Sequence, residues 1–355
     1  MIAILKREWK SYFQNITGWL FIAAVLALYG LYFLAYNLRA GYPYVSYTLS
    51  AISFIMLIAV PILTMRSMAE ERHSRTDQLV LTAPVSLGKM IFGKFLAMVG
   101  VFTVAVAVIA VTPLVLAAFG TVPMGENYVA VLGFWLYGCT CIAVGMLASA
   151  LTESQVIAAV VAFAFLFLGY MMNSITGLIG DHLITKVLGA YDLYTPLQSF
   201  MSGCLDLTGV VYFVSVTALC LFLTCQCVQK RRWSMTTKKL TTGMFSVAMI
   251  VVGFAVAVAV NLVVKEMPSS WTAVDATSTK LYSLTDTTKD YVKNLSQDVT
   301  IYVLSSEKSA DSTLAETLQR YEDLSKHLNV VYKDPAKSPN FYQQYTDSAP
   351  SQNSM

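Results

Sequence analysis

Seven long apolar runs constrain the fold of this chain more than any other feature of its sequence. A bilayer core about 30 Å thick requires roughly 20 apolar residues in a helix that rises about 1.5 Å per residue. Runs of this kind cover residues 16–38, 46–65, 91–119, 128–151, 155–172, 208–228 and 243–264. The sequence therefore predicts an α-helical integral membrane protein with about seven transmembrane helices.

The composition agrees with this fold class. Apolar residues make up 56% of the chain and charged residues 13%, whereas soluble domains carry about 25% charged residues. A water-soluble enzyme and an intrinsically disordered chain are both excluded on these grounds. Two prolines fall inside the runs, and we expect a bend at Pro61 and a kink, tilt or re-entrant end at Pro113.

The basic residues predict the orientation in the membrane. If the seven runs cross the membrane in alternating directions, 13 of the 15 Lys and Arg among residues 1–264 fall on the same side of the bilayer as the N-terminus. The two exceptions are Arg39 and Lys186. Loops rich in Lys and Arg stay in the cytoplasm. We therefore expect a multi-pass protein of the cell (cytoplasmic) membrane with a cytoplasmic N-terminus and, after seven spans, an extracytoplasmic region 265–355.

The first fifteen residues have an amphipathic pattern. Ile2, Leu5, Trp9 and Phe13 repeat at spacings of three and four, while charged and polar residues take the other face. This pattern is typical of an interfacial helix on the cytoplasmic surface. A simple cytoplasmic extension of the first span is the alternative.

Region 265–355 has an ordinary soluble composition with a net charge of −3, against +6 for residues 1–264. Residues 298–304 and 328–332 are rich in β-branched and aromatic side chains, and a helical stripe from Leu314 to Leu324 separates them. A strand, a helix and a second strand predict a βαβ unit with parallel strands. A lone unit cannot cover its own sheet, so we expect a partial α/β domain that is incomplete.

Charged residues concentrate in segment 68–94, between the second and third runs. A charge run is usually a solvated face, and composition alone favours that interpretation. The order of residues, however, resembles the first cytoplasmic loop of ABC-2 type transporter permeases. The matching residues are Glu70, Glu71, Arg72, Thr76, Leu79, Leu81, Thr82, Pro84, Val85, Ser86, Gly93 and Lys94. The family commonly has glycine where this chain has Arg75.

The resemblance extends beyond this loop. The segment from Lys6 to Trp19 is similar to the family's interfacial helix, and residues 203–233 are similar to the region around its sixth span. Residues 275–277, 282–285 and 299–303 resemble the start of the auxiliary subunit of gliding-motility type ABC transporters. The resemblance implies a permease domain over residues 16–232, a linker and seventh helix over 233–264, and a fused extracytoplasmic auxiliary domain over 265–355.

The resemblance also implies a function. It implies an export permease, not itself an enzyme, that couples ATP hydrolysis by a separate ATPase subunit to substrate movement. ATP and magnesium would bind the partner ATPase, and this chain would hold no cofactor. The resemblance further implies that this chain forms a homodimer or a heterodimer of permease subunits, in contact with membrane lipid. The coupling loop would be residues 66–90, and its candidate residues are Glu70, Glu71, Arg72, Arg75, Thr76 and Pro84.

Other kinds of site have weaker support. Residues 88–94 match a phosphate-binding loop in spacing, but Phe95 stands where that motif requires Ser or Thr. We expect no metal site and no nucleic-acid binding. The outer loop before the sixth span offers a possible polar site at Asp181, His182, Asp192 and Asp206.

Two alternatives to an ABC permease remain. The first is an ion-coupled carrier, which needs ionisable residues near the midplane of the membrane. The spans contain essentially none, which argues against it. The second alternative is a non-transporting membrane anchor or assembly scaffold of an ABC-type complex that presents the outer domain. The transported substrate could be a lipid, a glycan, a peptide or a drug.

Overall fold

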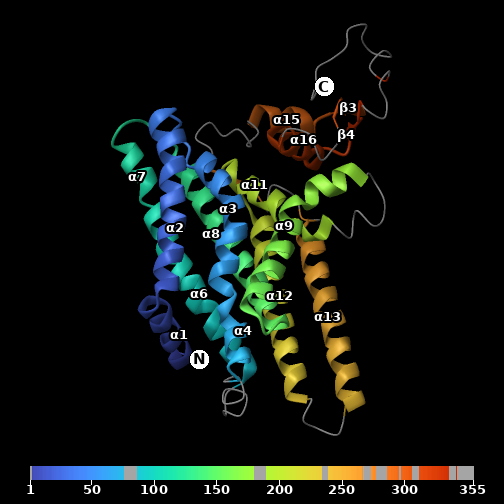
Figure 1. Ribbon diagram of the computed structural model, residues 1–355. Coiled ribbons are helices and arrows are strands. Elements are labelled where there is room, and N and C mark those ends of the chain that lie inside the picture. Colours follow the sequence, from blue (N-terminus) through green and yellow to red (C-terminus); the bar gives the residue numbers. More distant parts are fainter. Residues whose placement is uncertain are drawn as a thin grey trace.

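The computed structural model shows a bundle of long helices with a small α/β region beyond one end (Figure 1). Within the described residues, seven helical segments are long and apolar enough to cross a membrane, which confirms the predicted fold class. These segments are Ile16–Arg39, Ser46–His73, Leu87–Ala117, Met124–Leu151, Gln155–Ile179, Leu207–Gln229 and Ala248–Lys265. The structure describes residues 2–75, 86–179, 189–233, 239–265, 267, 273–276, 286–295, 297–305, 312–335 and 341.

The bundle is preceded by α1 (Ile2–Gln14), a helix that packs against α6 at the end of the bundle where the N-terminus lies (Figure 1). The long helices and the short elements between them follow in chain order. They are α2 (Ile16–Phe33), η1 (Leu34–Arg39), α3 (Ser46–Thr64), α4 (Arg66–His73), α6 (Leu87–Ile109), α7 (Thr112–Ala117), α8 (Met124–Leu151), α9 (Gln155–Ile179), η2 (Gly189–Tyr191), α11 (Tyr194–Met201), α12 (Leu207–Trp233) and α13 (Lys239–Lys265).

The two prolines of the spans have different consequences. Pro113 stands in the first turn of α7, directly after α6 has ended at Ile109, so the third span is interrupted there as expected. A proline is tolerated in the first turn of a helix because the amide it lacks has no partner inside that helix. Pro61 lies inside α3, which continues to Thr64 before the chain turns at Met65 into α4.

α8 occupies the centre of the bundle and packs against α3, α6, α9, α11 and α12. Glycines on α8 allow these neighbours to approach closely. A Cβ atom at Gly138 would lie 2.2 Å from the ring of Phe102 on α6, and one at Gly145 would lie 2.3 Å from the hydroxyl of Thr64 on α3. The small residues of the fourth span therefore set the helix spacing of the core.

α13 lies at the edge of the bundle beside α12 (Figure 1). None of the residues in its apolar 18-residue window is buried within the chain. Asn261 of α13 donates a hydrogen bond of 2.7 Å to the Ser215 hydroxyl of α12. Among the described elements, α12 is thus the main neighbour of the seventh helix.

The region after α13 lies beyond the opposite end of the bundle from α1 and α4 (Figure 1). β3 (Val299–Val303) and β4 (Leu328–Tyr332) pair in parallel and are connected through α16 (Ser312–Leu324), as predicted for a βαβ unit. A second helix, α15 (Asp286–Lys293), contacts α16. The sequence did not predict the antiparallel pair of β1 (Cys204–Asp206) with β2 (Ala273–Asp275), which ties this region to the residues before α12.

Candidate functional site

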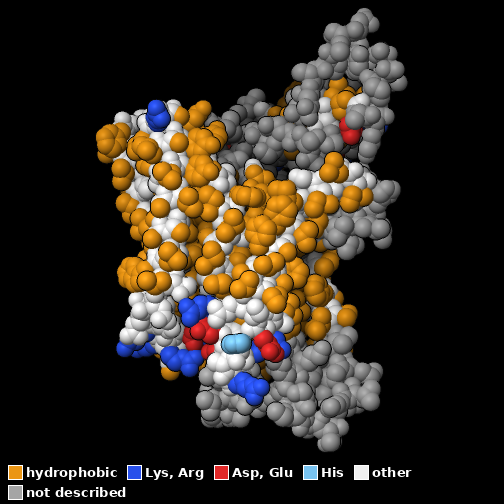
Figure 2. All heavy atoms as spheres, viewed as in Figure 1, with side chains coloured by type: hydrophobic (Ala, Val, Ile, Leu, Met, Phe, Trp, Pro, Cys, Tyr) orange, Lys and Arg blue, Asp and Glu red, His pale blue; other side chains and the backbone are white. Residues whose placement is uncertain are grey.

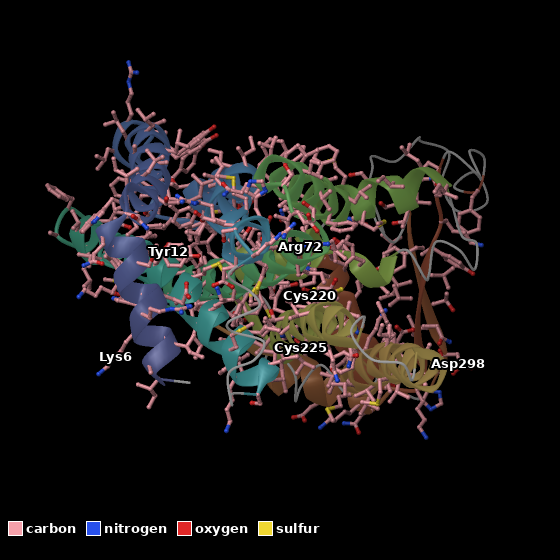
Figure 3. All side chains as sticks on the ribbon, turned by 60° about the horizontal axis from the view of Figure 1, so that its bottom comes forward. Lys6, Tyr12, Arg72, Cys220, Cys225 and Asp298 are labelled. Carbon is pink, nitrogen blue, oxygen red and sulfur yellow. The ribbon has the colours of Figure 1, made fainter. Side chains whose placement is uncertain are left out.

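Charged side chains gather at the end of the bundle that carries α1 and α4, below a broad apolar band (Figure 2). We call this region the charged end. In Figure 3, which brings it forward, Lys6 points outward from α1, whereas Arg72 lies over the middle of the bundle. The side chains at the charged end are not simply solvated, because several bind across helix boundaries.

The turn between α3 and α4 is fixed by a buried hydroxyl from another helix. Ser149 of α8 accepts hydrogen bonds of 3.1 Å from the backbone amides of both Met68 and Ala69. The same hydroxyl donates to the Met65 carbonyl at 3.0 Å. The first amides of a helix have no partner inside the helix, so Ser149 caps α4 from outside and joins it to the core.

Lys94 of α6 is the buried cation of the site. Its side chain is 3% exposed, and its ammonium lies 2.6 Å from the Glu71 carboxylate and 3.5 Å from that of Glu8. It also donates to the Ser67 carbonyl at 3.1 Å. A buried ammonium is costly unless it is paired and hydrogen-bonded, and here residues from α1 and α4 supply the partners. The expectation that the spans carry essentially no ionisable residues is therefore wrong for Lys94.

α1 contributes a second cation to this group. Arg7 lies 2.6 Å from the Glu8 carboxylate and 3.7 Å from that of Glu71. The hydrogen bond to Glu8 raises the pKa of Arg7, so the guanidinium stays charged. We call Arg7, Glu8, Glu71 and Lys94 the Lys94 cluster. It joins α1, α4 and α6, and the predicted helix at residues 1–15 is in this way attached to the bundle.

Two further contacts, a hydrogen bond from Arg66 and an ion pair of Arg72, attach α4 to its surroundings. Arg66 forms a bidentate pair with Glu70, with both N–O distances 2.8 Å, and donates to the Thr17 hydroxyl of α2 at 3.2 Å. Arg72 lies 2.6 Å from Glu153, in the turn between α8 and α9. Residues from α1, α2, α6, α8 and that turn therefore all bind α4 or its N-terminal turn.

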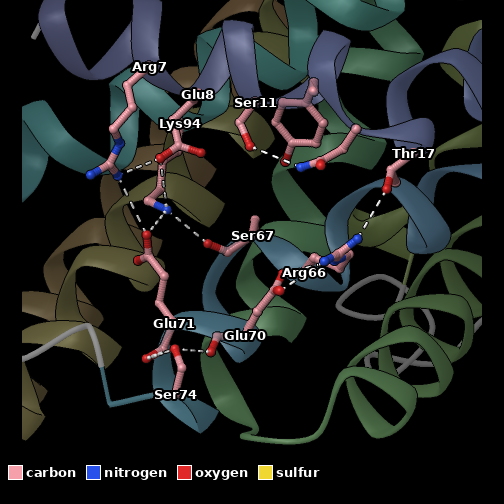
Figure 4. A pocket seen from close by; sticks show the side chains of 12 residues that line it. Arg7, Glu8, Ser11, Thr17, Arg66, Ser67, Glu70, Glu71, Ser74 and Lys94 are labelled. Carbon is pink, nitrogen blue, oxygen red and sulfur yellow. Dashed lines mark hydrogen bonds and ion pairs between the residues drawn. The ribbon is translucent and has the colours of Figure 1, made fainter.

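A cavity of about 500 Å³ opens between α1, α2, α4 and α6 (Figure 4). We call it the polar pocket. Its lining residues are Arg7, Glu8, Ser11, Tyr12, Asn15, Thr17, Arg66, Ser67, Glu70, Glu71, Ser74 and Lys94. Burial raises the pKa of Tyr12, so its phenol is neutral and can donate a hydrogen bond. The pocket thus combines three cations, three carboxylates and neutral hydroxyl groups.

The structure places the predicted coupling residues as follows. Glu70, Glu71 and Arg72 lie on α4, and each is paired within the chain, whereas Arg75 follows the helix and is exposed. Thr76 and Pro84 lie outside the described residues. Sequence reasoning missed Glu8, Lys94 and Ser149 as members of the site. A signal existed for two of them, since Lys94 is a cation inside the apolar run 91–119 and Glu8 is the only acidic residue before Glu70.

The predicted outer polar site has a different arrangement. The Asp192 carboxylate accepts hydrogen bonds from the amides of Tyr194 and Thr195 at the start of α11. Asp206 likewise binds the amide of Thr208 at the start of α12, at 2.8 Å. Both carboxylates therefore bind free amides in the first turn of the helix that follows them. Asp181 and His182 lie outside the described residues.

Metal-ligating residues are dispersed in the described part of the chain. No three His, Cys, Asp or Glu side chains there are grouped so that they could hold a metal ion. All six cysteines are thiols, and Cys220 and Cys225 lie on α12 (Figure 3).

Arg75 is the one departure from the expected loop pattern, and its backbone conformation shows why glycine is common at this position. Its φ is +56°, in the left-handed region that glycine adopts without strain and that commonly ends a helix. The glycine that the resemblance led us to expect at this position would suit this geometry. Arg75 instead adopts it with a side chain, at a cost of about 1 kcal/mol.

We expect Arg75→Gly to be more stable than Arg75→Ala, by about 1 kcal/mol, because glycine alone relieves the left-handed backbone. Both substitutions remove the same charge, so each is the other's electrostatic control. The measurement is the unfolding midpoint of the purified protein in detergent. Equal midpoints would show that the turn is not strained.

The fold and the charged end define a multi-pass membrane subunit with a polar, internally bonded helix at one end of its spans. The family model of the ABC-2 family transporter protein matches residues 36–228, more than half of the chain. The chain belongs to this family, whose members are membrane subunits of ABC transporters and not their catalytic part, and the family implies a partner ATPase. A domain of unknown function, DUF7088, matches residues 278–353. No curated protein and no solved structure matches the chain.

Proposed function

We propose that this chain is the permease of an export-type ABC transporter in a cell membrane, driven by a separate cytoplasmic ATPase. The observation that carries the proposal is α4, a charged helix at the end of the spans that is bonded to α1, α2, α6, α8 and the α8–α9 turn. A force applied to such an element reaches several spans at once. We infer that α4 and the rest of loop 66–90 couple ATP hydrolysis to substrate movement.

The physical requirement for coupling supports this assignment. Closure of an ATPase dimer can shift a membrane protein between two states only if the ATPase contacts the two states differently. Such contacts need a rigid polar element outside the apolar band, and internal ion pairs and a buried cap make α4 rigid. The excess of Lys and Arg at this end favours its cytoplasmic location.

The exposed end of α4 is the best candidate for the ATPase contact. His73, Ser74 and Arg75 are exposed, whereas Glu71 and Arg72 are partly buried in pairs with Lys94 and Glu153. The role of Glu71 and Arg72 would then be to position α4. Arg75 would carry the charge that the ATPase recognises.

We expect Arg75→Glu to reduce co-purification of the ATPase about tenfold. If the ATPase recognises the positive charge of Arg75 with acidic groups, a glutamate there would face those groups, and like charges across an interface are strongly unfavourable. Membrane insertion should be unchanged, since Arg75 is exposed. The measurements are pull-down of the ATPase and ATP turnover in proteoliposomes. Arg75→Gln controls for loss of charge, and Arg39→Glu controls for charge reversal at the end of the first span distant from α4.

A result in which Arg75→Glu retains full ATPase binding and turnover would contradict the proposed contact. Loss of binding with Arg39→Glu as well would indicate a general effect of charge on the protein.

The scaffold alternative has one observation in its favour. The β1–β2 pair holds the start of the C-terminal region against the residues before α12, so the outer domain is attached to the permease by backbone hydrogen bonds. We propose that this domain is an extracytoplasmic, fused auxiliary unit of gliding-motility type. Reconstituted vesicles that hydrolyse ATP with the partner but move no lipid, glycan or peptide would favour the scaffold.

A further inference from the structure

We propose that the polar pocket binds the headgroup of a zwitterionic aminophospholipid, a phosphoethanolamine lipid, at the junction of α1, α2 and α4. This binding site goes beyond the proposed transport function and does not depend on it. Four observations support it, namely the balance of charge in the lining, an unpartnered buried hydroxyl, the apolar surface beside the pocket and the kind of donors and acceptors present.

The lining of the pocket is electrically balanced. It contains the cations Arg7, Arg66 and Lys94 and an equal number of carboxylates, from Glu8, Glu70 and Glu71. A net anion would need an excess of cations, as polybasic lipid-binding sites provide. A ligand that carries a phosphate and an ammonium separated by a short linker can complement both signs at once.

A buried polar group in the lining has no partner in the described structure. Ser67 is 7% exposed, and its hydroxyl oxygen is buried without a hydrogen bond. Buried polar groups are nearly always satisfied in native proteins, and an unsatisfied one costs about 1–3 kcal/mol. Because Ser67 lines the pocket, a ligand oxygen there can supply the missing bond when the hydroxyl turns toward it.

The guanidinium of Arg66 can receive a phosphate oxygen. Arginine has five N–H groups, and the described bonds to Glu70 and Thr17 engage three of them. Its side chain is 39% exposed, so the remaining N–H groups are accessible. Guanidinium groups bind phosphate with matching geometry.

The surface that leads away from the pocket is suited to acyl chains. Ile58 and Ile62 are 52% and 41% exposed and stand one helical turn apart, and Arg66 follows after one more turn on the same face of the continuing chain. Ile16, next to Thr17 on α2, is also exposed. In a transmembrane helix such side chains face lipid. A lipid can therefore place its tails on this face while its headgroup enters the pocket.

The donors in the headgroup decide between ethanolamine and choline. A primary ammonium donates hydrogen bonds to carboxylates, which the pocket offers on Glu8, Glu70 and Glu71. A quaternary ammonium has no N–H group and is typically bound by several aromatic faces, whereas the lining contains one aromatic residue, Tyr12. The chemistry of the lining therefore favours phosphoethanolamine.

The experiment is native mass spectrometry of the full chain in mixed micelles with equal amounts of palmitoyl-oleoyl phosphatidylethanolamine, phosphatidylcholine and phosphatidylglycerol. We expect selective retention of phosphatidylethanolamine. Ser67→Ala and Arg66→Gln should each weaken it about tenfold, the effect of one lost hydrogen bond to a charged group. Arg39→Gln, at the end of the first span distant from the pocket, is the matched control and should retain the lipid.

Ser67→Ala separates ligand binding from folding. Without lipid its thermal stability should equal or exceed that of the unmodified protein, because the substitution removes an unsatisfied buried hydroxyl. Equal retention of phosphatidylethanolamine and phosphatidylcholine, or a preference for phosphatidylglycerol, would overturn the proposal. Unchanged phosphatidylethanolamine binding in both pocket variants would overturn it as well.

Discussion

Replacing Lys94 with methionine is expected to destabilise the membrane domain by about 3 kcal/mol. Lys94 is buried between Glu71 and Glu8, and removal of one partner of a buried ion pair leaves uncompensated charge, at a typical cost of about 3–5 kcal/mol. The lower value applies because both carboxylates keep some exposure. Methionine preserves most of the side-chain length, so the effect reports charge and hydrogen bonding more than volume.

The measurement is the free energy of unfolding in mixed detergent micelles. Lys89→Met, on the exposed face of the same helix, is the matched control and should cost little. Lys94→Met combined with Glu71→Gln should recover part of the loss, because it removes one of the uncompensated carboxylates. If Lys94→Met is no less stable than Lys89→Met, the Lys94 cluster does not hold α1, α4 and α6 together.

The seven spans were predictable because a membrane helix has a strong local signature. A run of about 20 apolar residues suffices to define each one, and the interruption at Pro113 follows from the missing amide of proline. The βαβ unit was predictable for a similar reason, since strand and helix periodicities alternate between Val299 and Tyr332. In both cases the decisive information lies within one short segment.

The charged end was predictable in position but not in its bonding. The sequence showed that Glu71 and Arg72 belong to a charged loop, but their partners Lys94 and Glu153 lie 23 and 81 residues away in the chain. Whether a charge is solvated or paired depends on helix packing that no local pattern specifies. The role of Ser149 as a cap for α4 depends in the same way on the packing of α4 against α8.

Substituting Ser149 with alanine is expected to impair coupling more than insertion. The substitution removes a hydroxyl that satisfies the amides of Met68 and Ala69 and the carbonyl of Met65. Loss of such a cap costs about 1–2 kcal/mol, and the cost falls on the junction between α4 and α8. We expect ATP turnover by the partner ATPase in proteoliposomes to lose most of its stimulation by the permease.

The control for Ser149→Ala must remove a buried hydroxyl whose hydrogen bond stays within its own helix. Thr224 meets this condition, because its hydroxyl is buried and bonds to the Cys220 carbonyl of its own helix at 2.7 Å. Thr224→Val keeps the shape of the side chain and should leave stimulated turnover nearly intact. Equal stimulation by the two variants, at equal amounts of assembled complex, would mean that α4 transmits no force through α8. The ion pairs of Lys94 and Arg72 and the Arg66–Thr17 hydrogen bond would then be the polar connections left between α4 and the spans.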